Sequence, residues 1–168
     1  GRAKITSPWH VEITKDDGSK QTLATRSIVV ATGAAPFVPP LPGLEDVGYL
    51  TSDTLWGLRE QPKRLVVLGG GPIGCELAQS FARLGSQVTQ IEMLPRIMIR
   101  EDEEVSAYAK KALEADGVTI LTGHKALRCE KRDEAKSIVV ENNGKESSIE
   151  FDVLLCAVPK VSYSLSSR

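Results

Sequence analysis

Apolar residues in the middle of the chain fall into short continuous runs, which alternate with longer segments of helical spacing. The segments at residues 64–68, 87–91 and 118–121 predict strands of a parallel sheet, and the four apolar residues at 65–68 are typical of a strand that is covered on both faces. Segments that begin near residues 72 and 101 have apolar side chains three and four positions apart and predict helices. We therefore expect an α/β fold in which helices cover both faces of a parallel sheet.

Each of the two predicted helices has one apolar face. In the first helix this face consists of Leu77, Ala78, Phe81, Ala82 and Leu84. In the second it consists of Val105, Tyr108, Ala109, Ala112 and Leu113. The acidic run at residues 101–104 favours the start of the second helix, since carboxylates stabilise the positive end of a helix dipole.

The pattern changes in the last third of the chain. Residues 125–130, 136–141 and 147–151 predict antiparallel strands of a β-meander, and Asn143-Gly144 is a strong hairpin-turn signal. The apolar run at residues 153–158 predicts a last buried strand that rejoins the parallel sheet.

The first 60 residues predict a hairpin, a stiff connection and a short helix. Residues 9–14 and 21–30 read as paired strands around a turn signal, and the second strand ends in an apolar run. Residues 36–42 contain four prolines, which exclude a helix or a central strand. Residues 54–60 follow N-capping side chains and predict a short helix.

A glycine-rich turn, residues 69–74, follows the first central strand and reads Gly-x-Gly-x-x-Gly. A dinucleotide-binding βαβ unit needs strand, glycine turn and helix in this order. Gly69 permits the tight turn, Gly71 lets a diphosphate approach the backbone, and Gly74 lets the helix pack closely on the sheet. Pro72 suits the first helical turn, where no N–H is required.

Glu92 ends the second strand, 18 residues after Gly74. An acid about 20 residues beyond the motif hydrogen-bonds the adenosine ribose in such units. A carboxylate there would repel a 2′-phosphate, so the sequence favours NAD(H) over NADP(H). The alternative interpretations are an ordinary strand-to-helix turn for the glycines and a solvated strand end for Glu92.

Composition excludes several other classes of function. The chain has 168 residues and a net charge of −1, which gives no electrostatic case for binding nucleic acid or an anionic membrane. No apolar run approaches the roughly 20 residues of a membrane span, and we expect no signal peptide. The chain starts at Gly1 without a methionine, so we expect an excised piece of a longer protein.

The three cysteines match no metal or disulfide framework, so we expect no metal site and no redox pair. Cys75 and Cys156 lie in apolar segments and are interpreted as core residues. This cysteine usage favours a reducing, cytoplasmic setting. The acidic run at residues 101–104 lacks histidines or spaced ligands and is interpreted as a helix start rather than a metal site.

Three segments together carry a family resemblance. They are residues 25–36 with their Ala-Thr-Gly sequence, the linker at residues 41–53, and the glycine turn with its Ile-Gly-x-Glu pattern at residues 68–78. In combination they resemble the central part of the flavin-dependent pyridine nucleotide–disulfide oxidoreductases, the family of dihydrolipoamide dehydrogenases and mercuric reductases. The resemblance extends over nearly all of residues 9–158.

The resemblance implies an NAD(P)H-binding domain that presents the nicotinamide to FAD, from which electrons pass to a disulfide or a similar acceptor. It implies that Ile73 and Glu76 lie near the nicotinamide, that Glu92 lies at the adenosine ribose and that Ala157 lines the cofactor. The alternatives are helix packing for Ile73 and a favourable interaction with the helix dipole for Glu76. No residue of the chain is expected to be catalytic.

Parts of the family pattern are absent from the sequence. It has no earlier glycine motif for FAD, no Cys-x4-Cys pair and no C-terminal interface domain. FAD, the flavin domain, the interface domain and a homodimer are therefore expected only of a full-length parent. The chain alone should be inactive, bind NAD(H) weakly and hold no FAD. Pro159 stands where the family usually has glycine, so we expect a departure at that turn.

The predicted organisation is a flavin-domain remnant at residues 1–52, an NAD(P)-binding domain at 53–160 and a disordered tail at 161–168. A rival hypothesis is a non-catalytic nucleotide-binding or assembly module with no flavin partner. A simple NAD-dependent dehydrogenase is a second rival, but it would require a catalytic His, Lys or Tyr constellation that the sequence does not display.

Overall fold

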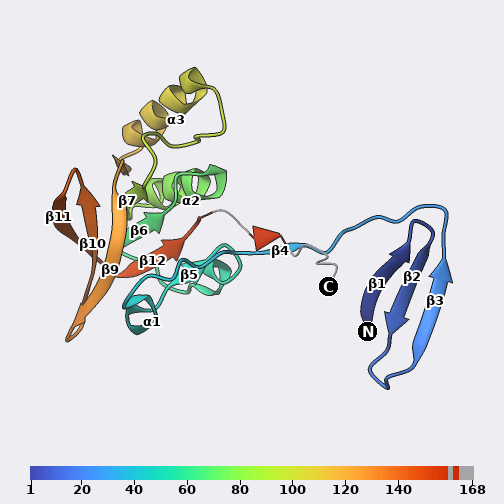
Figure 1. Cartoon of the computed structure of the whole chain (residues 1–168). Helices are drawn as coiled ribbons and strands as arrows, with labels where there is room; N and C mark the ends of the chain where they lie inside the picture. Colours follow the sequence, from blue (N-terminus) through green and yellow to red (C-terminus); the bar gives the residue numbers. More distant parts are fainter. Residues whose placement is uncertain (159–160, 163–168) are drawn as a thin grey trace. The chain divides into compact units, whose positions relative to one another are not determined.

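The computed structural model describes residues 1–158 and 161–162 (Figure 1). Pro159 and most of the predicted tail, residues 163–168, lie outside the described residues. The chain divides into two compact units, of which the second spans Pro36–Val161.

The first unit, which begins with residues Gly1–Ala35, contains a three-stranded antiparallel sheet in the order β1-β2-β3. Its strands are β1 (Arg2–Ser7), β2 (His10–Thr14) and β3 (Lys20–Ala24), followed by the two-residue strand β4 (Ala34–Ala35). The predicted hairpin is present as β2 and β3, while β1 was not predicted.

The returning strand was predicted through Val30, and this was wrong. β3 ends at Ala24, and the side chains of Val29 and Val30 are 87% and 57% exposed. Among the described residues no strand pairs with this apolar run. Strand propensity reflects packing against neighbouring strands, so β-branched residues do not form a strand here without a partner.

The second unit begins with the proline-rich connection. It continues through α1 (Leu44–Val47), β5 (Leu50–Thr51) and the 3-10 helix η1 (Leu55–Gly57). The short helix predicted at residues 54–60 is thus a single 3-10 turn, and α1 was not predicted. α1 lies between Gly43 and Gly48, which both have positive φ.

A five-stranded parallel sheet forms the centre of the second unit, in the order β5-β12-β6-β7-β8. Its longer strands are β6 (Arg64–Leu68), β7 (Gln87–Glu92), β8 (Thr119–Thr122) and β12 (Val153–Cys156). The predicted parallel sheet is confirmed, and β12 rejoins it between β5 and β6 as the apolar run indicated.

The predicted antiparallel meander is also confirmed. It consists of β9 (Lys125–Arg132), β10 (Ala135–Asn142) and β11 (Lys145–Phe151), with β10 in the middle. β13 (Val161–Ser162) ends the described chain. Asn143 and Gly144 both have positive φ, which is the backbone geometry of the tight turn that their sequence indicated.

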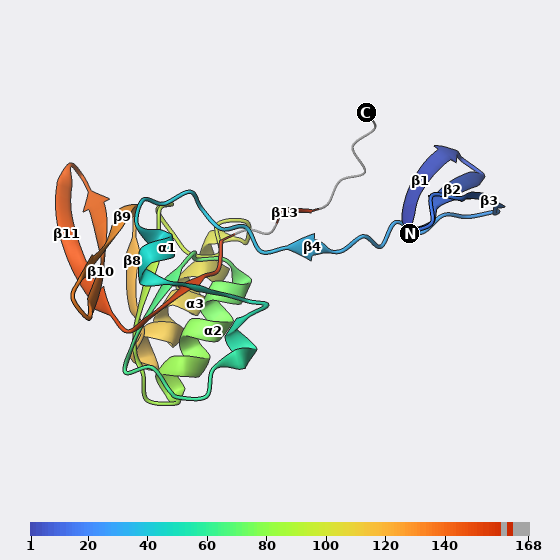
Figure 2. The same cartoon turned by 90° about the horizontal axis from the view of Figure 1, so that it is seen from below.

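The parallel sheet lies between two different layers (Figure 2). The helices α2 (Pro72–Arg83) and α3 (Glu103–Ala115) cover one face, where Leu65 and Val67 are buried. The meander and the single turn α1 cover the other face, where Val66 and Leu68 are buried. The α/β fold with its parallel sheet and meander is confirmed. The expectation of helices on both faces was met only by the single turn α1, because the meander occupies most of the face opposite the two long helices.

Two details of the predicted helix faces were wrong. Leu84 is 68% exposed, while Val105 and Tyr108 are 49% and 78% exposed. Leu84 is the C-cap of α2 and does not belong to the buried apolar face of this helix. α3 instead turns Ser106 inward, because the Ser106 hydroxyl donates a 2.6 Å hydrogen bond to the carbonyl of Ile97.

A polar clamp joins the starts of β6 and β12. The Asp152 carboxylate accepts hydrogen bonds from the backbone N–H of Arg64 at 2.8 Å and from its guanidinium at 3.1 and 2.8 Å. The hydrogen bond from the Arg64 side chain is the main cause that lowers the pKa of Asp152. The contacts between Arg64 and Asp152 therefore join β6 and β12 at the end of the sheet that lies opposite the glycine turn.

Candidate coenzyme site at the carboxyl edge of the sheet

The glycine turn leaves β6 beside the end of β12. Gly69 has φ +114°, a conformation that side chains rarely adopt, and an added Cβ would lie 2.5 Å from the carbonyl oxygen of Ala157. The backbone N–H of Ala157 donates to Leu68 at 2.8 Å, which extends the strand pairing up to this point. Gly69 and Ala157 therefore meet as bare backbone, as a close turn requires.

Gly74 and Gly71 have different surroundings. The carbonyl oxygen of Gly69 packs so closely on Gly74, in the first turn of α2, that a Cβ there would collide with it. A Cβ on Gly71 would meet no atom within 4 Å. Gly74 thus permits close packing of helix on turn, whereas Gly71 leaves an open approach to the backbone.

The N-terminus of α2 presents amide groups beside this open approach. Pro72 is the first helical residue, as predicted, and Gly71 is the N-cap. Among the described residues no side chain caps this helix end. The N–H groups of Ile73 and Gly74 belong to the first turn, where a helix has no internal acceptors, and the helix dipole is positive there. The arrangement suits an anionic group.

Glu92 binds backbone rather than projecting into solvent. One carboxylate oxygen accepts a 2.6 Å hydrogen bond from the N–H of Gly70, and the other accepts from Leu94 at 2.8 Å. The N–H of Met98 in turn donates to the Gly70 carbonyl at 2.7 Å. The half-buried Glu92 side chain therefore fastens the loop after β7 to the glycine turn, and it is not a solvated strand end.

Two residues of the turn were missed by sequence reasoning. A Cβ on Gly70 would lie 2.9 Å from the Glu92 carboxylate and 3.0 Å from Ile97, so a side chain here would displace one of these two neighbours. Gln90 is fully buried on β7 and donates to the Gly69 carbonyl at 3.0 Å. No signal in the sequence identified it, because Gln90 stands among other polar residues in a strand that reads Gln-Val-Thr-Gln-Ile-Glu.

Ile73 and Glu76 lie in the first turns of α2, where Ile73 is half-buried and Glu76 is exposed. Ile73 packs at the margin of the core between α2 and the sheet. Their placement near a nicotinamide stays a prediction.

The three cysteines are free and buried. Burial raises the pKa of Cys129 to about 11 and that of Cys156 to about 12, and it is also the main cause that raises the pKa of Cys75. A raised pKa keeps a thiol protonated at neutral pH, and only the thiolate is nucleophilic. The interpretation of Cys75 and Cys156 as core residues agrees with this burial.

We predict that the native chain does not react with Ellman's reagent at pH 7, because burial suppresses both ionisation and access. All three thiols should react once the chain is unfolded in guanidinium chloride. Absorbance at the thionitrobenzoate band, followed in parallel native and unfolded samples, measures this. Rapid labelling of the native chain would contradict the burial of these side chains.

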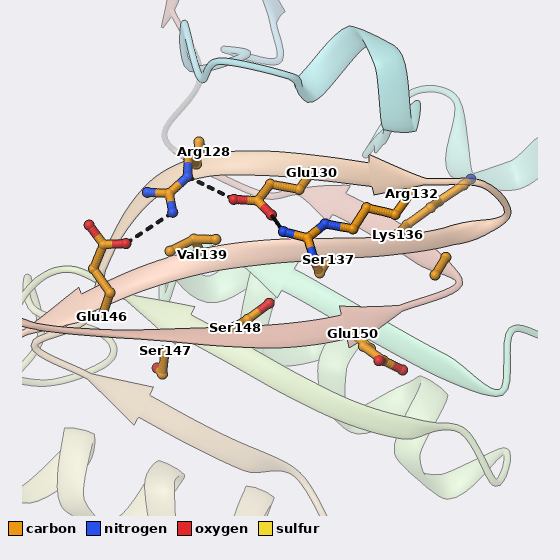
Figure 3. Close-up of a pocket in the computed structure, with 11 residues that line it drawn as sticks. Arg128, Glu130, Arg132, Lys136, Ser137, Val139, Glu146, Ser147, Ser148 and Glu150 are labelled. Carbon is orange, nitrogen blue, oxygen red and sulfur yellow. Dashed lines mark hydrogen bonds and ion pairs between the residues drawn. The ribbon is translucent and has the colours of Figure 1, made fainter.

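A hollow of about 430 Å³ lies elsewhere, on the outer face of the meander (Figure 3). Arg128 forms ion pairs with Glu130 at 2.9 Å and Glu146 at 3.0 Å, and Arg132 also pairs with Glu130. Since these charges neutralise one another, the hollow has no excess charge to attract an ionic ligand.

The described residues contain no group of three or more His, Cys, Asp or Glu side chains that could hold a metal ion. Within the same residues, none of the helices has the length and apolar character needed to cross a membrane.

The chain is similar to several known proteins. Residues 2–161 match the model of the pyridine nucleotide-disulphide oxidoreductase family. The mercuric reductase of Lysinibacillus sphaericus is 40% identical over 157 residues, which cover 94% of this chain and 28% of that protein. The dihydrolipoyl dehydrogenase of Thermus scotoductus is 37% identical over 166 residues, covering 94% of this chain and 34% of that protein.

A solved structure of the HOCl-induced flavoprotein disulfide reductase from Escherichia coli has the same fold. It superposes with a TM-score of 0.75 at 27% identity and covers 98% of this chain and 37% of that protein. The chain thus spans only about a third of the length of the proteins that it matches.

Proposed function

The chain belongs to the pyridine nucleotide-disulphide oxidoreductase family, and on this premise we propose that residues 53–160 are its nicotinamide coenzyme domain and bind NAD(H). The domain boundary at residue 52 is part of the proposal, since the compact unit itself begins earlier, at Pro36.

One observation carries the proposal. The backbone at Gly71 is open, and it lies at the uncapped N-terminus of α2, whose amides and dipole favour a diphosphate. Gly69 and Gly74 allow the close packing of the turn. Pro72 begins the helix at a position where a backbone N–H would have no acceptor within the helix. The proposal extends to Ala157, which meets Gly69 at the same edge of the sheet.

Glu92 supports NAD(H) as the preferred coenzyme. Its carboxylate lies at the end of β7 and is held by Gly70 and Leu94, so its negative charge is fixed beside the turn. Each carboxylate oxygen has a further lone pair that can accept a hydrogen bond from a ribose hydroxyl. A 2′-phosphate at this point would meet a fixed like charge, which disfavours NADP(H).

In a full-length parent, the reduced coenzyme would supply a hydride to FAD, and the electrons would continue to a disulfide or a similar acceptor. This chain's own residues contribute binding and orientation: the α2 amides hold the diphosphate, and Ile73 and Glu76 border the nicotinamide. The flavin domain, the C-terminal interface domain, the homodimer and a cytoplasmic location belong to this proposal for the parent.

Isothermal titration of the chain with NADH, NADPH and FAD tests the proposal. We expect NADH to bind, NADPH to bind at least about tenfold more weakly because of Glu92, and FAD to give no heat of binding. Tighter binding of NADPH would overturn the role given to Glu92. A chain that binds neither nicotinamide coenzyme would overturn the proposed function and favour a non-catalytic assembly module.

A further inference from the structure

We propose that Gln90 is a positioning residue, which together with Glu92 sets the orientation of the Gly69–Gly70 peptide in the coenzyme turn. The functional meaning of this inference rests on the proposed NAD(H) site. Gln90 and Glu92 are two positions apart on β7, so their side chains project from the same face of the sheet. Both reach the same peptide of the neighbouring turn.

The two side chains hold this peptide at opposite ends. The Gln90 amide nitrogen donates a 3.0 Å hydrogen bond to the Gly69 carbonyl oxygen. The Glu92 carboxylate accepts the 2.6 Å hydrogen bond from the Gly70 N–H. The carbonyl and N–H of a trans peptide point in opposite directions across one plane, so fixing one end fixes the other.

Gln90 therefore directs the Gly69 carbonyl away from the side where a diphosphate would bind. The carbonyl oxygen is directed under α2, against Gly74, and Gln90 reaches it there. If this peptide rotated, its oxygen would face the phosphate side and repel an anion, while the Gly70 N–H would leave Glu92. The glutamine thus acts through the peptide rather than by touching the coenzyme.

The surroundings of Gln90 indicate that it is not there for packing alone. Its side chain is fully buried against α2, and its nitrogen also lies 3.5 Å from the Cys75 sulfur. Its Oε1 atom has no hydrogen-bond partner among the described residues. An unpaired buried acceptor costs free energy that an apolar side chain of similar size would not incur. The bond to the Gly69 carbonyl is the stronger of the two compensating contacts, since sulfur is a weak acceptor.

The test compares wild type with Gln90→Met, which keeps the length and burial of the side chain but donates no hydrogen bond. Glycine-selective ¹⁵N labelling reports the Gly70 amide directly, in a spectrum of 13 amides, because one of the 14 glycines, Gly1, carries the terminal ammonium group. We expect the wild-type Gly70 proton to resonate far downfield because of its short bond to a carboxylate, and to move upfield in the variant. NADH should bind about tenfold more weakly to the variant, equivalent to about 1.4 kcal/mol.

The matched control is Thr89→Val on the same strand, a near-isosteric change on the opposite face from Gln90. It should leave both the Gly70 resonance and NADH affinity unchanged. An unmoved Gly70 resonance in Gln90→Met, or an affinity within about twofold of wild type, would overturn the inference.

Two further readouts keep the test decisive. If wild type does not bind NADH, the proposed function fails, and the Gly70 resonance alone still decides whether Gln90 positions the peptide. If Gln90→Met does not fold, the wild-type chain can be examined for scalar coupling across the bond between the Gln90 side-chain nitrogen and the Gly69 carbonyl carbon. Its presence supports the inference and its absence overturns it.

Discussion

Gly74→Ala should destabilise the domain by about 3 kcal/mol and abolish NADH binding, since overpacking of a tight contact is relieved only by moving backbone. The added Cβ would collide with the Gly69 carbonyl oxygen, and the Gln90 nitrogen lies 3.2 Å away on another side. Neither neighbour can withdraw cheaply, because the carbonyl belongs to the turn and the glutamine is fully buried. Urea denaturation measures the stability, and isothermal titration measures the binding.

Gly71→Ala is the matched control for this prediction. Its φ of −78° is open to every residue, and an added Cβ meets nothing within 4 Å. We expect its stability to stay within about 0.5 kcal/mol of wild type, as for other substitutions that meet no neighbour. NADH binding should nevertheless weaken, because the methyl group would occupy the approach to the diphosphate. Equal stability of the two alanine variants would contradict the packing role of Gly74.

The sequence predicted those parts of the fold in which local pattern and tertiary environment agree. The apolar runs of β6 and β12 are buried on both faces, so their composition indicated a parallel sheet. The turn of Asn143 and Gly144 needs positive φ at both residues, and its sequence indicates that geometry directly. The glycine turn could be placed for a similar reason, since its backbone tolerates no Cβ at Gly69.

The failures arose where tertiary partners decide the outcome. Val29 and Val30 are typical strand residues, but strand formation requires a paired neighbour. Tyr108 fitted a helical stripe, yet it is exposed, while Ser106 is buried and bonds the Ile97 carbonyl. The predicted residues Ala109 and Leu113 do pack in the core. Gln90 could not be identified as a site residue, because periodicity treats a polar residue as exposed unless its partner is known.

The site residues were predicted better as a backbone shape than as a set of side-chain contacts. Spacing placed Glu92 at the end of β7, where a ribose-binding acid is expected. Spacing did not indicate that its carboxylate also binds the N–H groups of Gly70 and Leu94. The same side chain therefore has a structural role in the loop and a proposed role in coenzyme selection, which substitution can separate.

Glu92→Ala should weaken NADH binding and reduce the preference for NADH over NADPH, while Glu92→Gln should mainly reduce the preference. Alanine leaves the N–H groups of Gly70 and Leu94 without their charged acceptor, a loss of about 2 kcal/mol because water replaces part of each bond. Glutamine keeps one acceptor oxygen near the turn but removes the charge that repels a 2′-phosphate. Urea denaturation and titration with both coenzymes measure the two effects.

Glu141→Ala is the control for Glu92→Ala. It also removes a carboxylate that accepts a hydrogen bond from a turn N–H, but at a place remote from the coenzyme site. Glu141 accepts a hydrogen bond of the same 2.6 Å length from the N–H of Gly144, in the turn between β10 and β11. It should cost some stability and leave the ratio of NADPH to NADH affinity unchanged. In Glu92→Ala that ratio should rise about tenfold, because the fixed negative charge is gone. An unchanged ratio would mean that Glu92 only fastens the loop and does not face the ribose.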